Sequence, residues 1–241
     1  MNYHFDWSVL WSGQSGHWLL SGLITTLQIS ALGWILAVAL GILSGALRTV
    51  PVAPLRWLAL SYVEFFKNVP LLVWMFFWYF AVPPRLPAAL QDWLFNHGAE
   101  FWAGTFALGV YHGARLSEVI RSGVQSIPKT QFEAALATGL TTTQAYRHIL
   151  LPIALRLIIP PATNETLNLL KNSSVALTIG VAELTFQTRQ IETYTAKAFE
   201  ALTAGTLIYL SLCLAVAAAM AHAEKRWAIP GMIARRSHVE S

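Results

Sequence analysis

The sequence predicts an all-α, polytopic membrane protein with five transmembrane helices. Charged residues make up only 12% of the 241 residues, about half the usual share of a soluble domain, and apolar residues make up 55%. No charged side chain occurs between Asp6 and Arg48, a stretch far longer than the roughly 20 residues that cross a bilayer as a helix. Further apolar stretches follow at residues 57–82, 101–127, 153–181 and 201–223.

The distribution of Lys and Arg predicts the orientation of these spans, because cationic residues collect on the cytoplasmic side of membrane proteins. Ten of the 16 cationic residues fall in the three segments that five spans place on one side: Arg48, Arg56, Arg121, Lys129, Arg147, Arg156, Lys225, Arg226, Arg235 and Arg236. We therefore expect the N-terminus outside and the C-terminus inside. Residues 1–17 form a periplasmic segment in this topology, 18–230 the transmembrane domain and 231–241 a cytoplasmic tail.

The first two spans carry interpretable polar and aromatic residues. Trp7, Trp11 and Trp18 are typical of anchors at the outer membrane interface. In the second span, Pro70 has no N–H to donate to the carbonyl of Phe66. The sequence therefore predicts a kink there, beside Lys67 and Asn68.

Charged residues inside the second and third spans are candidate functional groups, because each costs a few kcal/mol in the bilayer. Glu64 and Lys67 are three residues apart, and so are Arg115 and Glu118. That spacing fits two ion pairs, each within one helix, that only hold the bundle together. It also fits Lys67 and Arg115 both reaching one polar cavity, where a guanidinium binds a carboxylate through two hydrogen bonds.

The fourth span is the most polar, and the fifth is apolar with a single Cys213 that excludes disulfides and a cysteine metal site. Pro160-Pro161 is expected to break the regular helix hydrogen bonding of the fourth span. A polar stripe follows at Asn164, Asn168 and Lys171, flanked by Glu165 and Asn172. Such a stripe cannot face lipid, so it lines either a pathway or a contact between helices.

A polar helical segment at residues 128–152 joins the third and fourth spans. Its fixed elements are Glu133-Ala134-Ala135, then Gly139, then Ile149-x-Leu151-Pro152. A helical face with short side chains, which a partner can approach closely, is predicted at Ala134, Ala135 and Ala137. Gly139 can end this helix in a left-handed conformation. Thr141 and Gln144 have the spacing of a capping box for a second short helix over 142–151, and Pro152 begins the next span.

This segment resembles the cytoplasmic EAA loop of bacterial ABC importer permeases. The rest of the chain, from about residue 18 to 230, is similar to permeases of the polar amino acid family, which take up histidine, glutamine or glutamate. The residues that carry the likeness are Gly22, Thr25-Thr26-Leu27, the stretch from Tyr62 to Leu71, the stretch from Ser117 to Pro128, and Leu169 to Ser174. Within the family, Arg48 to Pro51, Asn68-Val69-Pro70 and Gly113-Ala114-Arg115 resemble the glutamate/aspartate permeases in particular. Two residues depart from the family pattern, Thr130 in place of a frequent glycine and Arg115 at a commonly neutral position.

The resemblance implies a type I ABC importer permease in the bacterial inner membrane. Such a chain is non-catalytic and binds no cofactor, because ATP and Mg²⁺ bind to a separate ATPase. Its implied partners are a second permease chain (a paralogue or a copy of itself), two ATPase subunits, a periplasmic amino acid-binding protein and membrane lipid, but no nucleic acid. The implied ATPase-coupling residues are Glu133, Ala134, Ala135, Gly139, Ile149, Leu151 and Pro152.

We expect the substrate pathway to include Lys67, Asn68, Arg115, Glu118, Asn164, Glu165, Asn168 and Lys171. An acidic substrate, glutamate or aspartate, explains the arginine at position 115, and a neutral polar amino acid such as glutamine is the alternative. An ion-coupled secondary carrier is a different class, disfavoured because the spans show no internal duplication. An intramembrane enzyme is disfavoured because the seven His residues are scattered and no HExxH or Gly-x-Ser-x-Gly motif occurs. The chain also lacks a P-loop, since no glycine is followed by lysine.

Overall fold

The computed structural model describes residues 3–48, 50 and 52–227, and these residues form helices and turns without a β-strand. The predicted tail 231–241, with Arg235 and Arg236, lies outside the described residues, as do Thr49 and Pro51. The elements in order are η1 (Trp7–Leu10), α1 (Ser15–Leu47), α2 (Ala53–Lys67), α3 (Leu71–Phe76), the π-helical turn η2 (Phe77–Ala81), η3 (Pro83–Arg85), α4 (Ala88–Asn96), α5 (Ala99–Gln125), α6 (Lys129–Ala137), α7 (Thr142–Ala145), the π-helical turn η4 (Tyr146–Leu150), α8 (Leu151–Asn172), η5 (Ser173–Ile179), α9 (Leu184–Thr195) and α10 (Ala198–Trp227).

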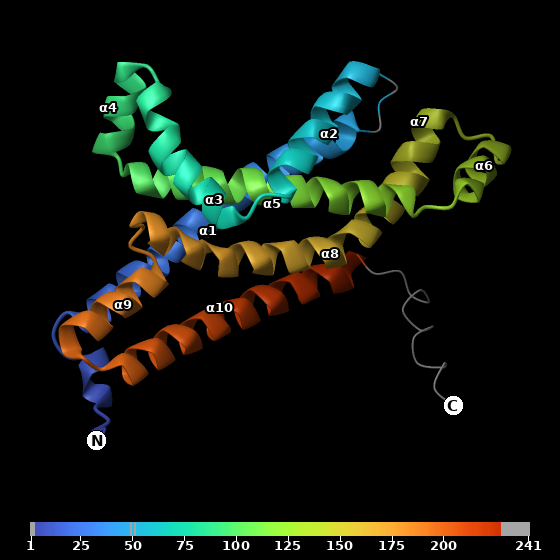
Figure 1. The fold of residues 1–241 in the computed structure, drawn as a ribbon. Helices are drawn as coiled ribbons and strands as arrows, with labels where there is room; N and C mark the ends of the chain where they lie inside the picture. Colours follow the sequence, from blue (N-terminus) through green and yellow to red (C-terminus); the bar gives the residue numbers. More distant parts are fainter. Residues whose placement is uncertain (1–2, 49, 51, 228–241) are drawn as a thin grey trace.

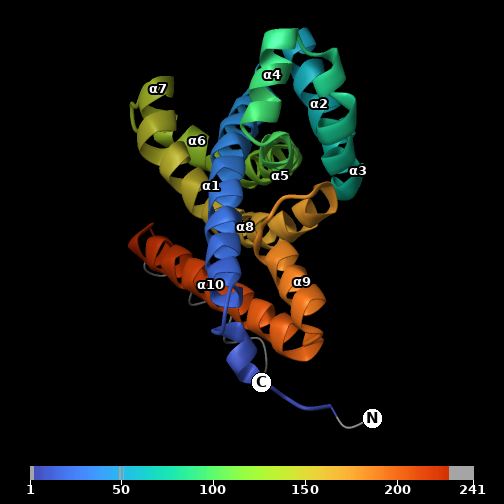
Figure 2. The same cartoon turned by 90° about the vertical axis from the view of Figure 1, so that its left-hand side faces the viewer.

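Helix α5 is the central element: α1, α2 and α8 pack against it, and α10 packs against α8 and α9 (Figures 1 and 2). The short helices α6 and α7 lie at one end of α5, and α4 lies at the other (Figure 1). The buried core is formed where α1, α3 and α5 meet the end of α8 and η5, with Ile29, Met75, Leu108, Leu169 and Ile179 among its members.

Helices α1 and α5 pack closely because glycines remove side chains from their interface. A Cβ built on Gly109 of α5 would lie only 2.6–2.8 Å from side-chain atoms of Leu36 on α1. A Cβ on Gly113 would lie 2.8 Å from the hydroxyl of Tyr62, which donates a 2.8 Å hydrogen bond to the carbonyl of Val110. Small residues at such positions let membrane helices approach closely without a hydrophobic driving force.

The second predicted span, residues 57–82, is not one kinked helix. It is broken between Lys67 and Leu71, and its two helical parts meet at an angle of 103°. Pro70 stands at the break, as expected, and the carbonyl of Phe66 that it leaves free accepts a 3.3 Å hydrogen bond from the indole N–H of Trp74. The segment is therefore either a sharply bent span or a re-entrant turn.

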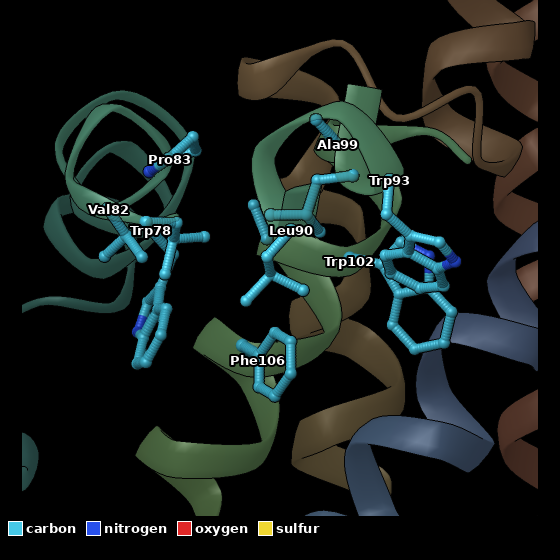
Figure 3. A pocket seen from close by; sticks show the side chains of 11 residues that line it. Trp78, Val82, Pro83, Leu90, Trp93, Ala99, Trp102 and Phe106 are labelled. Carbon is cyan, nitrogen blue, oxygen red and sulfur yellow. The ribbon is translucent and has the colours of Figure 1, made fainter. Parts of the chain in front are cut away.

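Residues 83–100, which lie between the second and third predicted spans, contain a helix of their own. Helix α4 folds back beside the start of α5, and the two enclose an apolar cavity with η2 and η3 (Figure 3). Residues 182–200, between the fourth and fifth predicted spans, likewise contain a helix, α9.

Pro160 and Pro161 have no N–H to donate, so two regular helix hydrogen bonds are missing as expected, but α8 continues through both prolines from Leu151 to Asn172. Helices in a membrane protein tolerate proline where neighbouring helices and local adjustments satisfy the freed carbonyls. The short helix expected over 142–151 is also not separate. It continues into α8 through the π-helical turn η4, which ends at Leu150, two residues before Pro152.

Among the described residues, two helices, α1 and residues 198–224 of α10, are long and apolar enough to cross a membrane, and the bent pair α2–α3 is a third if it is one span. Helices α5 and α8 coincide with the other two predicted spans but carry the charged and amide residues described above. The number of five spans therefore stays a prediction.

Gly109→Ala should destabilise the protein by about 1–3 kcal/mol, because the new methyl group overpacks the α1–α5 interface. We expect a lower thermal unfolding midpoint of the purified protein in detergent. Gly16→Ala is the matched control, since a Cβ there meets nothing closer than 3.4 Å. Equal midpoints for the two variants would contradict this account of the interface.

Candidate functional site

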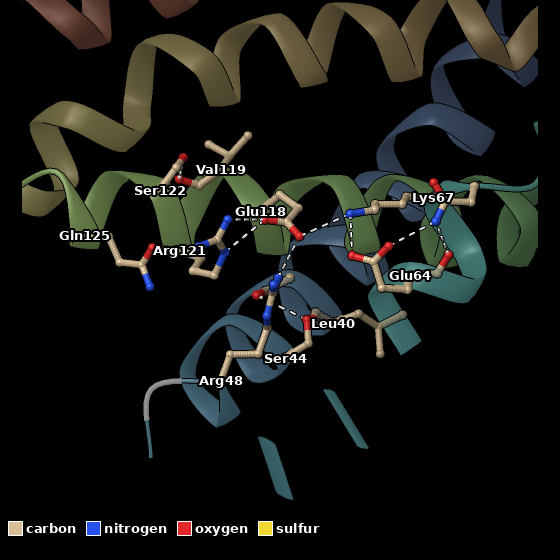
Figure 4. Close-up of polar contacts among 12 residues, drawn as sticks. Leu40, Ser44, Arg48, Glu64, Lys67, Glu118, Val119, Arg121, Ser122 and Gln125 are labelled. Carbon is tan, nitrogen blue, oxygen red and sulfur yellow. Dashed lines mark hydrogen bonds and ion pairs between the residues drawn. The ribbon is translucent and has the colours of Figure 1, made fainter. Parts of the chain in front are cut away.

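The first charged cluster is organised by Glu118 of α5, which lies between cations from three segments (Figure 4). Its Oε1 atom is 3.0 Å from Nη1 of Arg48, which follows α1, and 3.5 Å from Nζ of Lys67 at the end of α2. Its Oε2 atom is 2.9 Å from the guanidinium of Arg121, one turn along α5. One carboxylate thus connects α1, α2 and α5.

The cluster extends along α2 through Lys67. The Lys67 ammonium donates a 2.5 Å hydrogen bond to Glu64, and the side-chain amide of Asn68 donates to the same carboxylate at 3.0 Å. The predicted Glu64–Lys67 pair is therefore present, but Lys67 also contacts Glu118 on another helix. Three cations and two carboxylates compensate one another here, which lowers the cost of charge in the membrane.

The second cluster joins α5 to α8 through Arg115. Its Nε and Nη2 atoms donate to the two carboxylate oxygens of Glu165 at 3.0 and 3.1 Å. The alternative of an Arg115–Glu118 pair is therefore wrong: each of these residues pairs across helices with another partner. The Arg115 side chain remains 40% exposed, whereas that of Glu165 is 10% exposed. Arg115 also lies over the ring of Tyr111, 5.8 Å from its centroid.

His112 supports Glu165 from the buried side of this cluster. Its Nδ1 atom lies 3.2 Å from Glu165 Oε2, and its Nε2 atom lies 3.2 Å from the side-chain amide nitrogen of Asn172. A neutral imidazole with its proton on Nδ1 satisfies both contacts, because it donates to the carboxylate and accepts from the amide. The fully buried His112 thus fixes the carboxylate that holds Arg115.

The remaining polar residues of α8 lie on another face of the helix. Asn164 and Lys171 are exposed and Asn168 is partly exposed, and their side chains form no hydrogen bond or ion pair within the part of the chain that the structure describes. Glu165 and Asn172 instead face α5. The structure thus divides the predicted stripe into an inner pair and an open row of two amides and one ammonium.

The segment between α5 and α8 contains the predicted docking residues. The N–H groups of Gly139 and Leu140 donate to the carbonyls of Leu136 and Ala135, and Gly139 has a φ of +85°, so α6 ends in a Schellman motif as the sequence indicated. The capping box of Thr141 and Gln144 is also present.

Within α6, Glu133 and Ala134 are exposed, but Ala135 is buried, which corrects the expectation that it belongs to the open alanine face. The rings of Phe132 and Tyr146 lie 5.7 Å apart and hold α6 against η4. Ile149 is partly buried in η4, Leu151 is exposed, and Pro152 lies in the first turn of α8.

Sequence reasoning missed three buried charged groups of the described residues, Arg48, Glu183 and Glu200. It placed Arg48 in a cytoplasmic loop, although its side chain is 5% exposed and pairs with Glu118. It gave no role to Glu183, which is fully buried and accepts from the N–H groups of Thr185 and Phe186 and from the hydroxyl of Tyr209. The position of Glu183 at the start of α9 is an N-cap signal that could have revealed the helix.

Residues 37–229 match the family model described as "Binding-protein-dependent transport system inner membrane component". The chain is 40% identical over 218 residues to the glutamate/aspartate import permease protein GltJ of Escherichia coli K12, covering 89% of each chain. It is 34% identical to the glutamine transport system permease protein GlnP of the same strain, covering 93% of this chain and 99% of the relative. The probable glutamine ABC transporter permease protein GlnM of Bacillus subtilis 168 is 36% identical and covers 86% of this chain and 92% of its own length.

The fold is similar to that of a chain in the crystal structure of an amino acid ABC transporter with histidines. The TM-score is 0.80 at 28% identity, and the match covers 93% of this chain and all of the other. An inward-facing structure of the MetNI methionine ABC transporter shares the fold alone, with a TM-score of 0.65 at 18% identity over 90% of this chain and all of the other.

Glu118→Gln should lower stability by about 1–3 kcal/mol, because the cations of three segments lose their shared negative charge. We expect a lower thermal unfolding midpoint and faster proteolysis near α2. Glu192→Gln is the control, because its partner Arg189 is 3.9 Å away and 65% exposed, so this pair contributes little. A Glu118 variant as stable as the Glu192 variant would show that the cluster does not hold the helices together.

Proposed function

Because the chain belongs to the family of binding-protein-dependent transport system inner membrane components, and is the permease component of an amino acid ABC importer in the inner membrane, we propose that it imports acidic amino acids, glutamate and aspartate. Hydrolysis of ATP takes place on a separate partner. Family membership is incompatible with the ion-coupled carrier considered from the sequence, since members depend on a binding protein.

The arrangement of Arg115 carries the substrate proposal. Glu165 occupies two of the guanidinium's five N–H donors, and the exposed part of the side chain leaves other donors for a second carboxylate. His112 prevents Glu165 from moving aside, so the orientation of the guanidinium is set before substrate arrives. The side-chain carboxylate of glutamate would then bind on the open edge of Arg115. The similarity to GltJ supports this proposal.

A neutral polar substrate such as glutamine is the second candidate, and two observations favour it. Glu165 already neutralises the charge of Arg115, and the open row on α8 offers amides at Asn164 and Asn168 that suit another amide. The glutamine permeases among the relatives agree with this alternative.

The proposal extends to topology and assembly. We propose five spans, with residues 1–17 in the periplasm, 18–230 as the transmembrane permease domain and 231–241 in the cytoplasm. The partners are a second permease chain, two ATPase subunits that bind ATP and Mg²⁺, and a periplasmic binding protein. The position of α6 and α7 at the end of α5 opposite α4 supports a docking surface on one side of the membrane and substrate delivery on the other (Figure 1).

The substrate proposal is tested with the whole importer in lipid nanodiscs, by measuring ATPase activity with the binding protein loaded in turn with glutamate, aspartate or glutamine. We expect stimulation by the two acidic ligands alone. Arg115→Gln should reduce this stimulation roughly 10- to 100-fold, because a charge-assisted hydrogen bond contributes about 1.5–3 kcal/mol. Stimulation by glutamine that persists in Arg115→Gln would establish the second candidate instead.

A double variant separates binding from structure. Arg115→Gln leaves Glu165 without its partner, whereas Arg115→Gln with Glu165→Gln removes both charges. If Arg115 binds substrate, glutamate-dependent activity stays low in the double variant. Recovery of activity would show that the arginine serves only to neutralise Glu165. Arg189→Gln, at an exposed arginine of α9, is the control for a lost cation.

The docking surface is tested by Ala134→Trp, which places a large side chain on the exposed face of α6. We expect the permease to fold but to lose its ATPase subunits during purification, with at least a tenfold loss of stimulated ATPase activity. Ala89→Trp is the matched control, an exposed alanine on the nine-residue helix α4 at the opposite end of the molecule. Normal co-purification of the Ala134 variant would contradict the assignment of α6.

A further inference from the structure

An apolar cavity of about 270 Å³ lies between η2–η3, α4 and the start of α5 (Figure 3). Its volume is close to the lower end of ligand pockets, which span roughly 300–1,000 Å³. The side chains of Trp78, Leu90, Trp93, Trp102 and Phe106 account for much of its lining, and none of the lining residues is charged.

The chemistry of this lining selects an apolar occupant. Apart from the indole N–H groups of the tryptophans, every lining side chain is aliphatic or aromatic. An amino acid zwitterion bound here would leave both of its charges without partners, at a cost of several kcal/mol. The cavity therefore differs from the Arg115 cluster in having an apolar lining. A hydrocarbon chain fits this lining better than a transported amino acid does.

The depth of the cavity agrees with the headgroup region of a bilayer. On α5 its lining runs from Ala99 to Phe106, the first two turns, which span about 10 Å. The whole of α5, with 27 residues, is about 40 Å long, close to the thickness of a bilayer with its interfaces. Tryptophans are enriched at that level.

A cation stands next to this cavity. Arg85 borders a neighbouring hollow that shares Val82 and Leu86 with the cavity. Its guanidinium donates to the carbonyl of Ala81 and forms no ion pair within the described residues. Phe77 and Phe80, on the same segment, are exposed and agree with a surface in contact with lipid. An arginine beside an apolar cavity complements a ligand with a phosphate on one end and a hydrocarbon chain on the other.

We propose that this cavity is a binding site for one phospholipid. An acyl chain lies against the tryptophans between α4 and α5, and the phosphate binds to Arg85. A lipid bound there would hold α4 against the start of α5.

The test uses the complete importer in nanodiscs of phosphatidylethanolamine and phosphatidylglycerol, with a phosphatidylglycerol that carries a diazirine in its acyl chain. After illumination, cross-linked peptides are identified by mass spectrometry. We expect cross-links concentrated in residues 78–106. Leu90→Trp, which fills the cavity, should lower their yield at least threefold. Leu214→Trp, on the exposed face of α10, should leave it unchanged.

The contribution of Arg85 is distinguished from that of the apolar cavity by comparing a lipid that has a phosphate with one that has none. Arg85→Gln should lower the cross-linking of phosphatidylglycerol at this site at least threefold, but not that of a diazirine diacylglycerol, which has no phosphate. Arg189→Gln is the control for a lost surface cation. Equal yields in wild type, Leu90→Trp and Arg85→Gln would overturn the proposal. So would cross-links of the lipid probe that lie outside residues 78–106, because the acyl chain would then not occupy the cavity. If Leu90→Trp fails to fold, the Arg85 comparison decides alone.

Discussion

The close contact between α1 and α5 is the constraint on which the rest of the structure depends. Glycines on α5 let the two backbones approach until Leu36 and Leu40 of α1 fill the space where side chains of α5 would be. With α5 fixed against α1, its remaining faces receive α2 and α3 on one side and α8 on the other. Both charged clusters are built on α5, so the positions of Lys67, Arg115, Glu118 and Glu165 follow from this packing.

The charges inside the bundle have become connections between helices. A carboxylate or guanidinium in a membrane is costly alone, and the local spacing of three residues offers each a partner on its own helix. The protein uses that option only in part. Glu118 gathers Arg48 and Lys67 from other segments, and Arg115 reaches Glu165 on α8. Long-range pairs of this kind oppose the separation of helices, which a pair within one helix cannot do.

Local signals in the sequence were read correctly where short-range chemistry decides the outcome. The end of α6 at Gly139, the capping box at Thr141 and the carbonyl freed by Pro70 each depend on residues within a few positions. The sequence failed where tertiary packing decides. The sequence did not distinguish Pro70, where the chain bends by 103° between α2 and α3, from Pro160 and Pro161, which lie inside the continuous helix α8. The difference depends on the helices that pack around each proline. For the same reason, the partners of Arg115 and Arg48 could not be read from spacing.

The N-terminal segment attaches to the opposite end of the chain, because the N–H of Asp6 donates to Glu200 at 2.7 Å and the rings of Phe5 and Trp7 contact Phe199. Helix α10 is thereby attached at its first turn. Only 6% of the residues in its most apolar stretch are buried within the protein. The helix is also held farther along its length, because Tyr209 donates to Glu183 at 2.7 Å and Thr163 of α8 donates to Glu224, near the last turn of α10, at 3.1 Å. Mechanically, α10 is therefore a strut attached near both ends, and a displacement of the N-terminal segment is transmitted along it to α8.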